Sequence, residues 1–175
     1  MKAQYHALSG GVAASMLIPV LGPYSAVFFA SSVLIDADHY LDYLYRNGFK
    51  DFSIKRMFTF HEKLFPKTSE TNFLGLSVGH TAEWLLLVYG TYVITNWTWL
   101  GAAFWGMLFH LMVDLVYLYQ GRRLTSRALS IIEYIIRWNR MKHAGLNPDL
   151  PYVSTLRTMS GFPEGKIGKT EQDDQ

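Results

Sequence analysis

The stretch from Phe73 to Gly121 carries only two formal charges, Glu83 and Asp114. Because about 18 to 20 mostly apolar residues are enough for one transmembrane helix, this stretch is long enough for two. The letters TNWTW within it predict a turn, and their tryptophans are typical of the aromatic belt at a membrane interface. We therefore expect a transmembrane helical hairpin, and the alternative is a pair of buried helices in a soluble core.

A second apolar stretch, from Ala7 to Ile35, carries no formal charge. Its segment IPVLGP predicts a turn or a strong kink, because proline removes a helical donor and glycine permits unusual backbone angles. The two remaining helices, about 8–18 and 24–35, would each be roughly 17 to 18 Å long and too short for ~30 Å of hydrocarbon. The sequence favours a re-entrant hairpin, with one kinked spanning helix as the alternative. A signal peptide fits poorly, because the stretch ends in acids rather than at a small-residue cleavage site.

Basic residues flank the predicted transmembrane hairpin on both sides. The segment from Arg46 to Asn72 holds six lysines and arginines against three acids, and the chain after Gly121 opens with Arg122 and Arg123. Since cytoplasmic loops carry an excess of lysine and arginine, we expect both flanks and both termini in the cytoplasm. The formal net charge of +2 is too small to indicate a nucleic-acid partner.

The chain after the hairpin predicts one more helix and a tail. Between Thr125 and His143, polar residues recur every three or four positions among leucine, isoleucine and tryptophan, which is typical of an amphipathic helix. Such a helix suits the headgroup region or the side of the helical bundle. We expect a single membrane-embedded helical domain over residues 1–145 and a polar tail over 146–175, disordered from about residue 161.

Ionisable residues within the apolar half of the chain are the strongest indication of chemistry. An ionisable group inside an apolar span costs several kcal/mol unless it is paired or coordinated, so it indicates a functional site. His110 and Asp114 are four residues apart, and His80 and Glu83 are three apart, so each pair is expected on one helix face. With no cysteine in the chain, a metal ion must be held by histidine or carboxylate.

The predicted depth of these ionisable residues in the membrane shows whether they can lie close together. At 1.5 Å per residue, His80 and Asp114 would lie about 8 to 11 Å below the cytoplasmic end of the hairpin, with His110 slightly deeper. A re-entrant first stretch would return His6 to the same boundary. The sequence therefore predicts one metal site near the cytoplasmic leaflet, with these candidate ligands: His6, Asp36, Asp38, His39, His61, His80, His110 and Asp114.

Imidazole and carboxylate ligands without thiolate suit zinc, manganese or iron, with zinc preferred, and the number of candidates is sufficient for two ions. A bound divalent ion lowers the pKa of water towards 7 and so allows ester hydrolysis without a protein nucleophile. Carboxylates beyond the ligand set would orient imidazoles or take the water proton, and the candidates for this catalytic role are Asp42 and Glu83. No serine lies in a G-x-S-x-G motif.

The order of these motifs resembles a known family. An early His6, the D-x-D-H cluster from Asp36 to His39, His80, and the letters GMLFHLMVD resemble the bacterial inner-membrane "membrane-bound metal-dependent hydrolase" family over roughly residues 1–119. The resemblance implies a metal-dependent hydrolase with distant similarity to zinc phospholipases C. The family's HRGxTHS-like stretch is absent, which leaves open whether His61 or His80 matches its first histidine, and Ile35 replaces the proline before D-x-D-H.

Together, these features predict an all-α integral membrane protein of a bacterial-type inner membrane, with its site facing the cytoplasm. We expect hydrolysis of a phosphoester or related ester, in a lipid-linked substrate, by metal-activated water. Membrane lipid is the expected partner. Two alternatives come from other classes: a non-enzymatic carrier of metal ions or protons, since intramembrane Asp/His chains also form ion pathways, and a structural membrane adaptor that binds a partner through the helix at 125–143.

Overall fold

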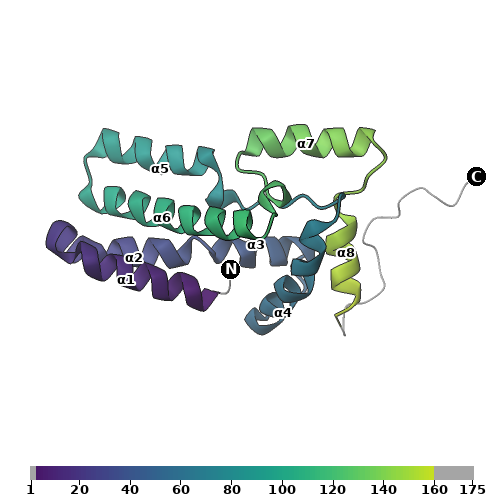
Figure 1. The fold of residues 1–175 in the computed structure, drawn as a ribbon, viewed down its shortest axis with the longest axis horizontal. Helices are drawn as coiled ribbons and strands as arrows, with labels where there is room; N and C mark the ends of the chain where they lie inside the picture. The colour runs from purple at the N-terminus through teal and green to yellow at the C-terminus, as the bar shows by residue number, and fades with distance from the viewer. Residues whose placement is uncertain (1–2, 160–175) are drawn as a thin grey trace, which may run out of the picture.

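The computed structural model describes residues 3–159, and within that range it is helical without a β-strand, which confirms the all-α class. The helices of residues 3–34 and 82–120 lie along one end of the molecule, and those of residues 54–64 and 131–157 gather at the other (Figure 1). The tail expected to be disordered from about residue 161 lies outside the described residues. The α-helices are α1 (Ala3–Leu21), α2 (Ser25–Leu34), α3 (Ala37–Arg46), α4 (Ile54–Leu64), α5 (Ala82–Thr95), α6 (Thr98–Gln120), α7 (Ile131–His143) and α8 (Leu150–Arg157).

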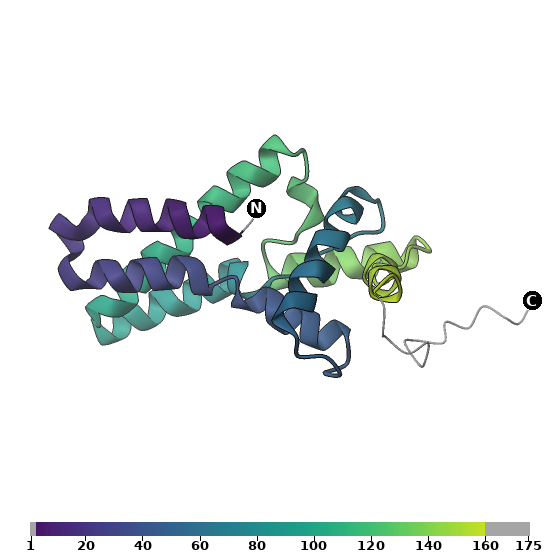
Figure 2. The ribbon, with the colours of Figure 1, turned by 90° about the horizontal axis from the view of Figure 1, so that it is seen from below.

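Helices α1 and α2 form an antiparallel hairpin, closed by the 3-10 turn η1 (Gly22–Tyr24) (Figure 2). Gly22 has a φ of +52°, a left-handed conformation that glycine adopts without steric cost. Helix α1 continues through Pro19 and has 19 residues, so it is about 28 Å long. The expectation of a short first helix is therefore wrong, because the chain reverses only after Leu21.

A second hairpin joins α5 to α6. Asn96 ends α5 in the left-handed conformation, with a φ of 54°, and the ring of Trp97 stacks on Trp99 with centroids 5.8 Å apart. Two helical stretches are long and apolar enough to cross a membrane, by length and composition. They are Gln4–Arg46, which includes the α1–α2 hairpin, and Thr98–Gln120. Helix α5 is apolar but shorter, with 14 residues.

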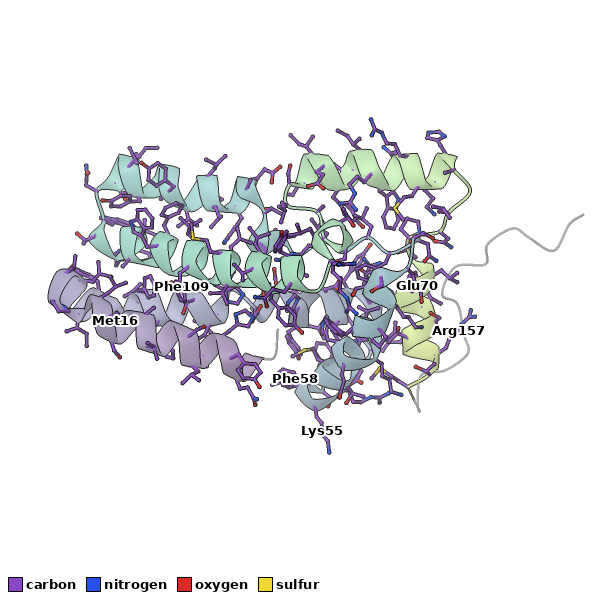
Figure 3. All side chains as sticks on the ribbon, in the orientation of Figure 1. Met16, Lys55, Phe58, Glu70, Phe109 and Arg157 are labelled. Atoms are coloured by element: carbon purple, nitrogen blue, oxygen red, sulfur yellow. The ribbon has the colours of Figure 1, made fainter. Side chains whose placement is uncertain are left out.

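These hairpins expose large apolar side chains to their surroundings (Figure 3). Met16 and Val20 on α1 are 75% and 79% exposed, and Ile94 on α5 is 82% exposed. Water-soluble monomers rarely present contiguous apolar surface of this kind. Further exposed apolar side chains lie on α1, α5 and α6: Leu8, Val12, Leu86, Leu87, Val93, Met112 and Val116.

Small residues allow α2 and α6 to pack with their backbones in close contact. Ala102, Ala103 and Gly106 of α6 are buried, as is Gly101, which faces Tyr92 of α5. A Cβ atom placed on Gly106 would lie 2.2 Å from the carbonyl oxygen of Phe28, so no larger residue fits there without movement. Such contacts are typical of membrane helices, which associate through close packing of small residues. This contact fixes the position of the next turn of α6.

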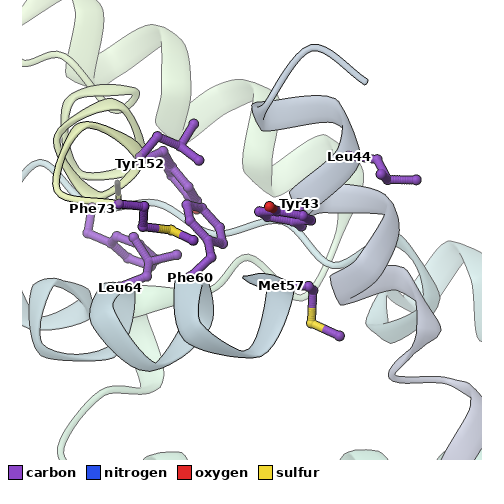
Figure 4. Close-up of a cluster of buried hydrophobic side chains, with 9 residues drawn as sticks. Tyr43, Leu44, Met57, Phe60, Leu64, Phe73 and Tyr152 are labelled. Carbon is purple, nitrogen blue, oxygen red and sulfur yellow. The ribbon is translucent and has the colours of Figure 1, made fainter. Parts of the chain in front are cut away.

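Helices α3, α4 and α8 enclose an aromatic core at the other end of the molecule (Figure 4). Tyr43, Phe60 and Leu156 are almost fully buried there. The hydroxyl of Tyr152 donates to the carbonyl oxygen of Leu74 over 3.0 Å, and burial raises the pKa of this hydroxyl well above its ordinary range. Residues 146–159 thus belong to the packed part of the chain, whereas the sequence places them in a polar tail.

Helix α7 is shorter than the sequence predicts. Residues 124–126 form the 3-10 turn η4, and Ser130 caps α7 by accepting from the amides of Ile132 and Glu133, so the helix begins only at Ile131. Between the two, the backbone is extended and pairs with the segment before α5. The Gly75 amide donates to the Ser126 carbonyl over 2.8 Å, and the Ala128 amide to the Gly75 carbonyl over 3.0 Å. This pairing holds Arg127 in a fixed position.

Candidate metal centre

Two fully buried histidines face each other where α2, α6 and the start of α5 meet. His80 lies in the 3-10 turn η3 (Val78–His80) just before α5, and His110 lies in α6. Their Nε2 atoms are 3.2 Å apart, and the two side chains are inaccessible to solvent. The contact is unusual because the same atom, Nε2, of each imidazole faces the other ring.

The other ring nitrogen of each histidine is already engaged. His110 Nδ1 lies 2.6 Å from the carbonyl oxygen of Ser32, which can only accept, so Nδ1 carries the proton. His80 Nδ1 lies 2.9 Å from the carboxylate of Asp38 and donates to it. Each ring, when neutral, therefore has its lone pair on Nε2. Two lone pairs at this distance repel unless a metal ion or a proton lies between them.

The carboxylate of Asp36 faces the same point. Its Oδ1 lies 3.3 Å from His110 Nε2 and 3.6 Å from His80 Nε2. Two imidazole nitrogens and one carboxylate oxygen thus converge as three electron-pair donors. Three protein ligands with one position left open is the arrangement of catalytic zinc sites, and the donors present fit a divalent cation.

Asp114 and His6 complete the cluster. His6 Nε2 lies 3.1 Å from Asp114 Oδ1, and the His6 ring stacks on His110 with centroids 4.0 Å apart. Asp114 Oδ2 lies 3.9 Å from His80 Nε2. The possible ligand atoms of His6, Asp36 and His110 are all within 4.8 Å of one another, as are those of His80, His110 and Asp114. The structure therefore brings five of the predicted ligands together.

Three further predicted ligands lie around this cluster. His39 Nε2 is 3.5 Å from Asp36 Oδ1, and its Nδ1 is 3.6 Å from Asp38 Oδ1. Asp38 Oδ1 is itself buried without a hydrogen-bond partner in residues 3–159. His61 instead contacts the edge of the site, where its Nε2 lies 3.0 Å from the carbonyl oxygen of His39 and donates to it.

The two carboxylates predicted to be catalytic are held elsewhere. Asp42 pairs with Arg46 over 3.2 Å, one helical turn along α3. Glu83 accepts from the Ser130 hydroxyl over 2.5 Å and from the Ile131 amide over 3.0 Å, and so anchors the start of α7. The expectation that Glu83 shares a helix face with His80 is wrong, because His80 precedes the N-cap residue of α5, Thr81.

Arg127 belongs to the site, although the sequence indicated it only as one polar residue of the helix predicted at 125–143. Its Nη1 donates to Asp114 Oδ2 over 3.1 Å, and the side chain is 10% exposed. Ser32 was also missed, because it contributes a backbone carbonyl rather than a side chain. The one signal for Arg127 was its isolation from other charges in the segment TSRALS.

Comparison with known proteins found no family model, curated protein or solved structure that matches the chain. The resemblance noted from the motifs therefore stays a prediction. The case for a function depends on the geometry of the cluster and on the apolar helices that carry it.

Proposed function

We propose that the chain is a metal-dependent hydrolase of a bacterial-type inner membrane, which cleaves a phosphoester or related ester, lipid-linked, at a site facing the cytoplasm. The observation that carries the proposal is the convergence of His80 Nε2, His110 Nε2 and Asp36 Oδ1 at 3.2 to 3.6 Å. Zinc suits these donors best, although manganese and iron also bind imidazole and carboxylate.

In this proposal each residue around the ion has a separate task. His80, His110 and Asp36 hold the ion. Asp38 and the Ser32 carbonyl fix the two imidazoles with Nε2 directed inward, as outer hydrogen-bond partners do in metal sites. When bound, the ion would supply a water of lowered pKa and polarise an ester oxygen.

Asp114 connects this centre to His6 and Arg127. Because its carboxylate lies between an imidazole and a guanidinium, its orientation is fixed from both sides. His6 comes from α1, so the first hairpin contributes a side chain to the site. The catalytic role predicted for Asp42 and Glu83 would require them to leave Arg46 and α7, so we propose no step for them.

The apolar surface of α1, α5 and α6 supports placement of the site in a membrane. A carrier of ions would need polar groups at successive depths beyond His110. The hydroxyls of Thr91 and Thr95 both donate to carbonyls of their own helix, at 2.8 and 2.7 Å. These hydroxyls therefore offer no path, which favours a site open on one side over a carrier.

Metal analysis of the detergent-purified protein tests the proposal, followed by assays with phosphodiester and carboxyl ester substrates. We expect at least one zinc, manganese or iron ion per chain, and hydrolysis that a chelator abolishes and the metal restores. His110→Ala should lose both the ion and the activity, whereas His143→Ala, at the exposed end of α7, should keep both. Metal retained by His110→Ala, or activity in metal-free protein, would contradict the proposal.

A further inference from the structure

Arg127 is a buried cation that is only partly neutralised. One nitrogen, Nη1, donates to a single oxygen of Asp114 over 3.1 Å. The other two nitrogens, Nε and Nη2, are buried and have no hydrogen-bond partner within the part of the chain that the structure describes. A buried guanidinium normally has its donors satisfied, since unpaired buried polar groups are costly.

The two nitrogens without partners are adjacent on the guanidinium. Nε and Nη2 form the side of the group whose parallel N–H bonds match two oxygens of a carboxylate or phosphate. If Arg127 served only to neutralise Asp114, this two-pronged side would be the one expected to contact the carboxylate. Instead, the contact with Asp114 uses one nitrogen and leaves the two-pronged side free.

Backbone pairing fixes the place of Arg127 beside the site. The segment that carries it is paired on both sides with Gly75, through the Ser126 carbonyl and the Ala128 amide. Beyond Arg127 lies the metal centre itself, because the Asp114 oxygen that Arg127 contacts is 3.9 Å from His80 Nε2. The free donors are therefore held one carboxylate away from the ligand cluster.

We propose that the Nε–Nη2 side of Arg127 binds the phosphate oxygens of the substrate beside the metal centre. This inference rests on the proposed hydrolase function and narrows its substrate to a phosphate ester, since a neutral carboxyl ester has no anionic oxygens for these donors. Lysine could not replace Arg127, because an ammonium presents a point charge and not two parallel N–H bonds.

The test measures inorganic phosphate binding to the zinc-loaded full chain in detergent, by titration calorimetry. We expect wild-type protein to bind phosphate at millimolar concentration or below. Arg127→Lys should weaken this binding by about 10- to 100-fold while the zinc content stays the same. Arg140→Lys, a matched change at an exposed position of α7, should bind phosphate as wild type does. Equal phosphate affinity in Arg127→Lys and wild type would overturn the proposal.

Wild-type protein keeps the proposal testable if Arg127→Lys does not fold. Zinc-loaded wild type that fails to bind millimolar phosphate overturns it, even if a neutral ester is hydrolysed, and in that case the hydrolase function stands. Arg127-dependent phosphate binding without hydrolysis supports the anion site and counts against the hydrolase function.

Competition distinguishes two sources of the phosphate group. If phosphatidic acid in mixed micelles displaces inorganic phosphate at a lower concentration than a soluble phosphodiester does, the bound phosphate belongs to a lipid headgroup. Displacement only by a soluble phosphodiester indicates a water-soluble substrate. Both results support an Arg127-dependent phosphate site, and displacement by neither overturns it.

Discussion

Replacing Gly106 by alanine tests how closely the packing of α2 and α6 controls the metal centre. The added Cβ would lie 2.2 Å from the Phe28 carbonyl oxygen, where ordinary contact begins at 3.4 Å. Because the obstacle is backbone, no side-chain rotation relieves it, and the two helices must separate by about 1 Å. Overpacking of this kind costs about 1 to 3 kcal/mol, and we expect a value near the upper end.

The same separation would disturb His110. This residue lies one turn after Gly106, and Ser32 lies one turn after Phe28, so the 2.6 Å contact from His110 Nδ1 to the Ser32 carbonyl spans the same interface. Loss of such an outer contact typically lowers metal affinity by about 10- to 100-fold. Gly106→Ala should therefore weaken zinc binding although it touches no ligand.

Gly90→Ala is the matched control, since a Cβ on this α5 glycine would meet no atom within 4 Å. Alanine is favoured over glycine in a helix by about 1 kcal/mol, so Gly90→Ala should be neutral or stabilising. The free energies of unfolding of the two variants should then differ by about 3 kcal/mol, which corresponds to about 6 to 12 °C in Tm for a chain of this size. Thermal unfolding in detergent and a zinc titration provide the measurements. Equal Tm and equal zinc affinity in the two variants would refute the argument from packing.

Three further predictions concern single groups. Asp114→Asn leaves Arg127 as an unpaired buried charge, so the free energy of unfolding, measured by denaturation in micelles, should fall by about 3 to 5 kcal/mol, and adding Arg127→Gln should restore it. Tyr152→Phe removes the bond to the Leu74 carbonyl and should lower the free energy of unfolding by about 1 kcal/mol in the same assay. Burial raises the pKa of Tyr152, so the folded protein keeps the hydroxyl proton near pH 10, where the unfolded chain loses it. The free energy of unfolding of wild type should therefore fall more steeply above about pH 10 than that of Tyr152→Phe.

The parts of the site that follow from local helix geometry could be predicted from the sequence. His110 and Asp114 are one helical turn apart, and both are buried on the same side of α6. Proline and glycine marked the place where the chain reverses before α2, and that reversal brings His6 to Asp114. In both cases a short-range rule was sufficient, because a helix or a turn is determined by neighbouring residues.

The parts that depend on contacts between distant segments could not be predicted. Arg127 reaches the site because its extended segment pairs with Gly75, and no periodic pattern indicates such a pairing. In the sequence, Glu83 has the pattern of an acid within a membrane span, yet its carboxylate accepts from the first amides of α7. The start of α7 was predicted six residues too early. The apolar residues of α8 are too few to stand out in a polar segment, although Tyr152 and Leu156 complete the aromatic core.

The candidate ligands are spread along the chain in a way that affects how the protein is made. Asp36 leaves the ribosome long before Asp114, and at about 5 to 20 residues per second the interval is roughly 4 to 16 s. Until His80 emerges, the carboxylate of Asp36 lacks both of its partners in the finished protein, and until His110 emerges it lacks one of them. An unpaired carboxylate is costly in hydrocarbon. We therefore expect the nascent α1–α2 hairpin to keep its Asp36 end in water until α6 has been inserted, so that membrane insertion of the two hairpins is ordered in time.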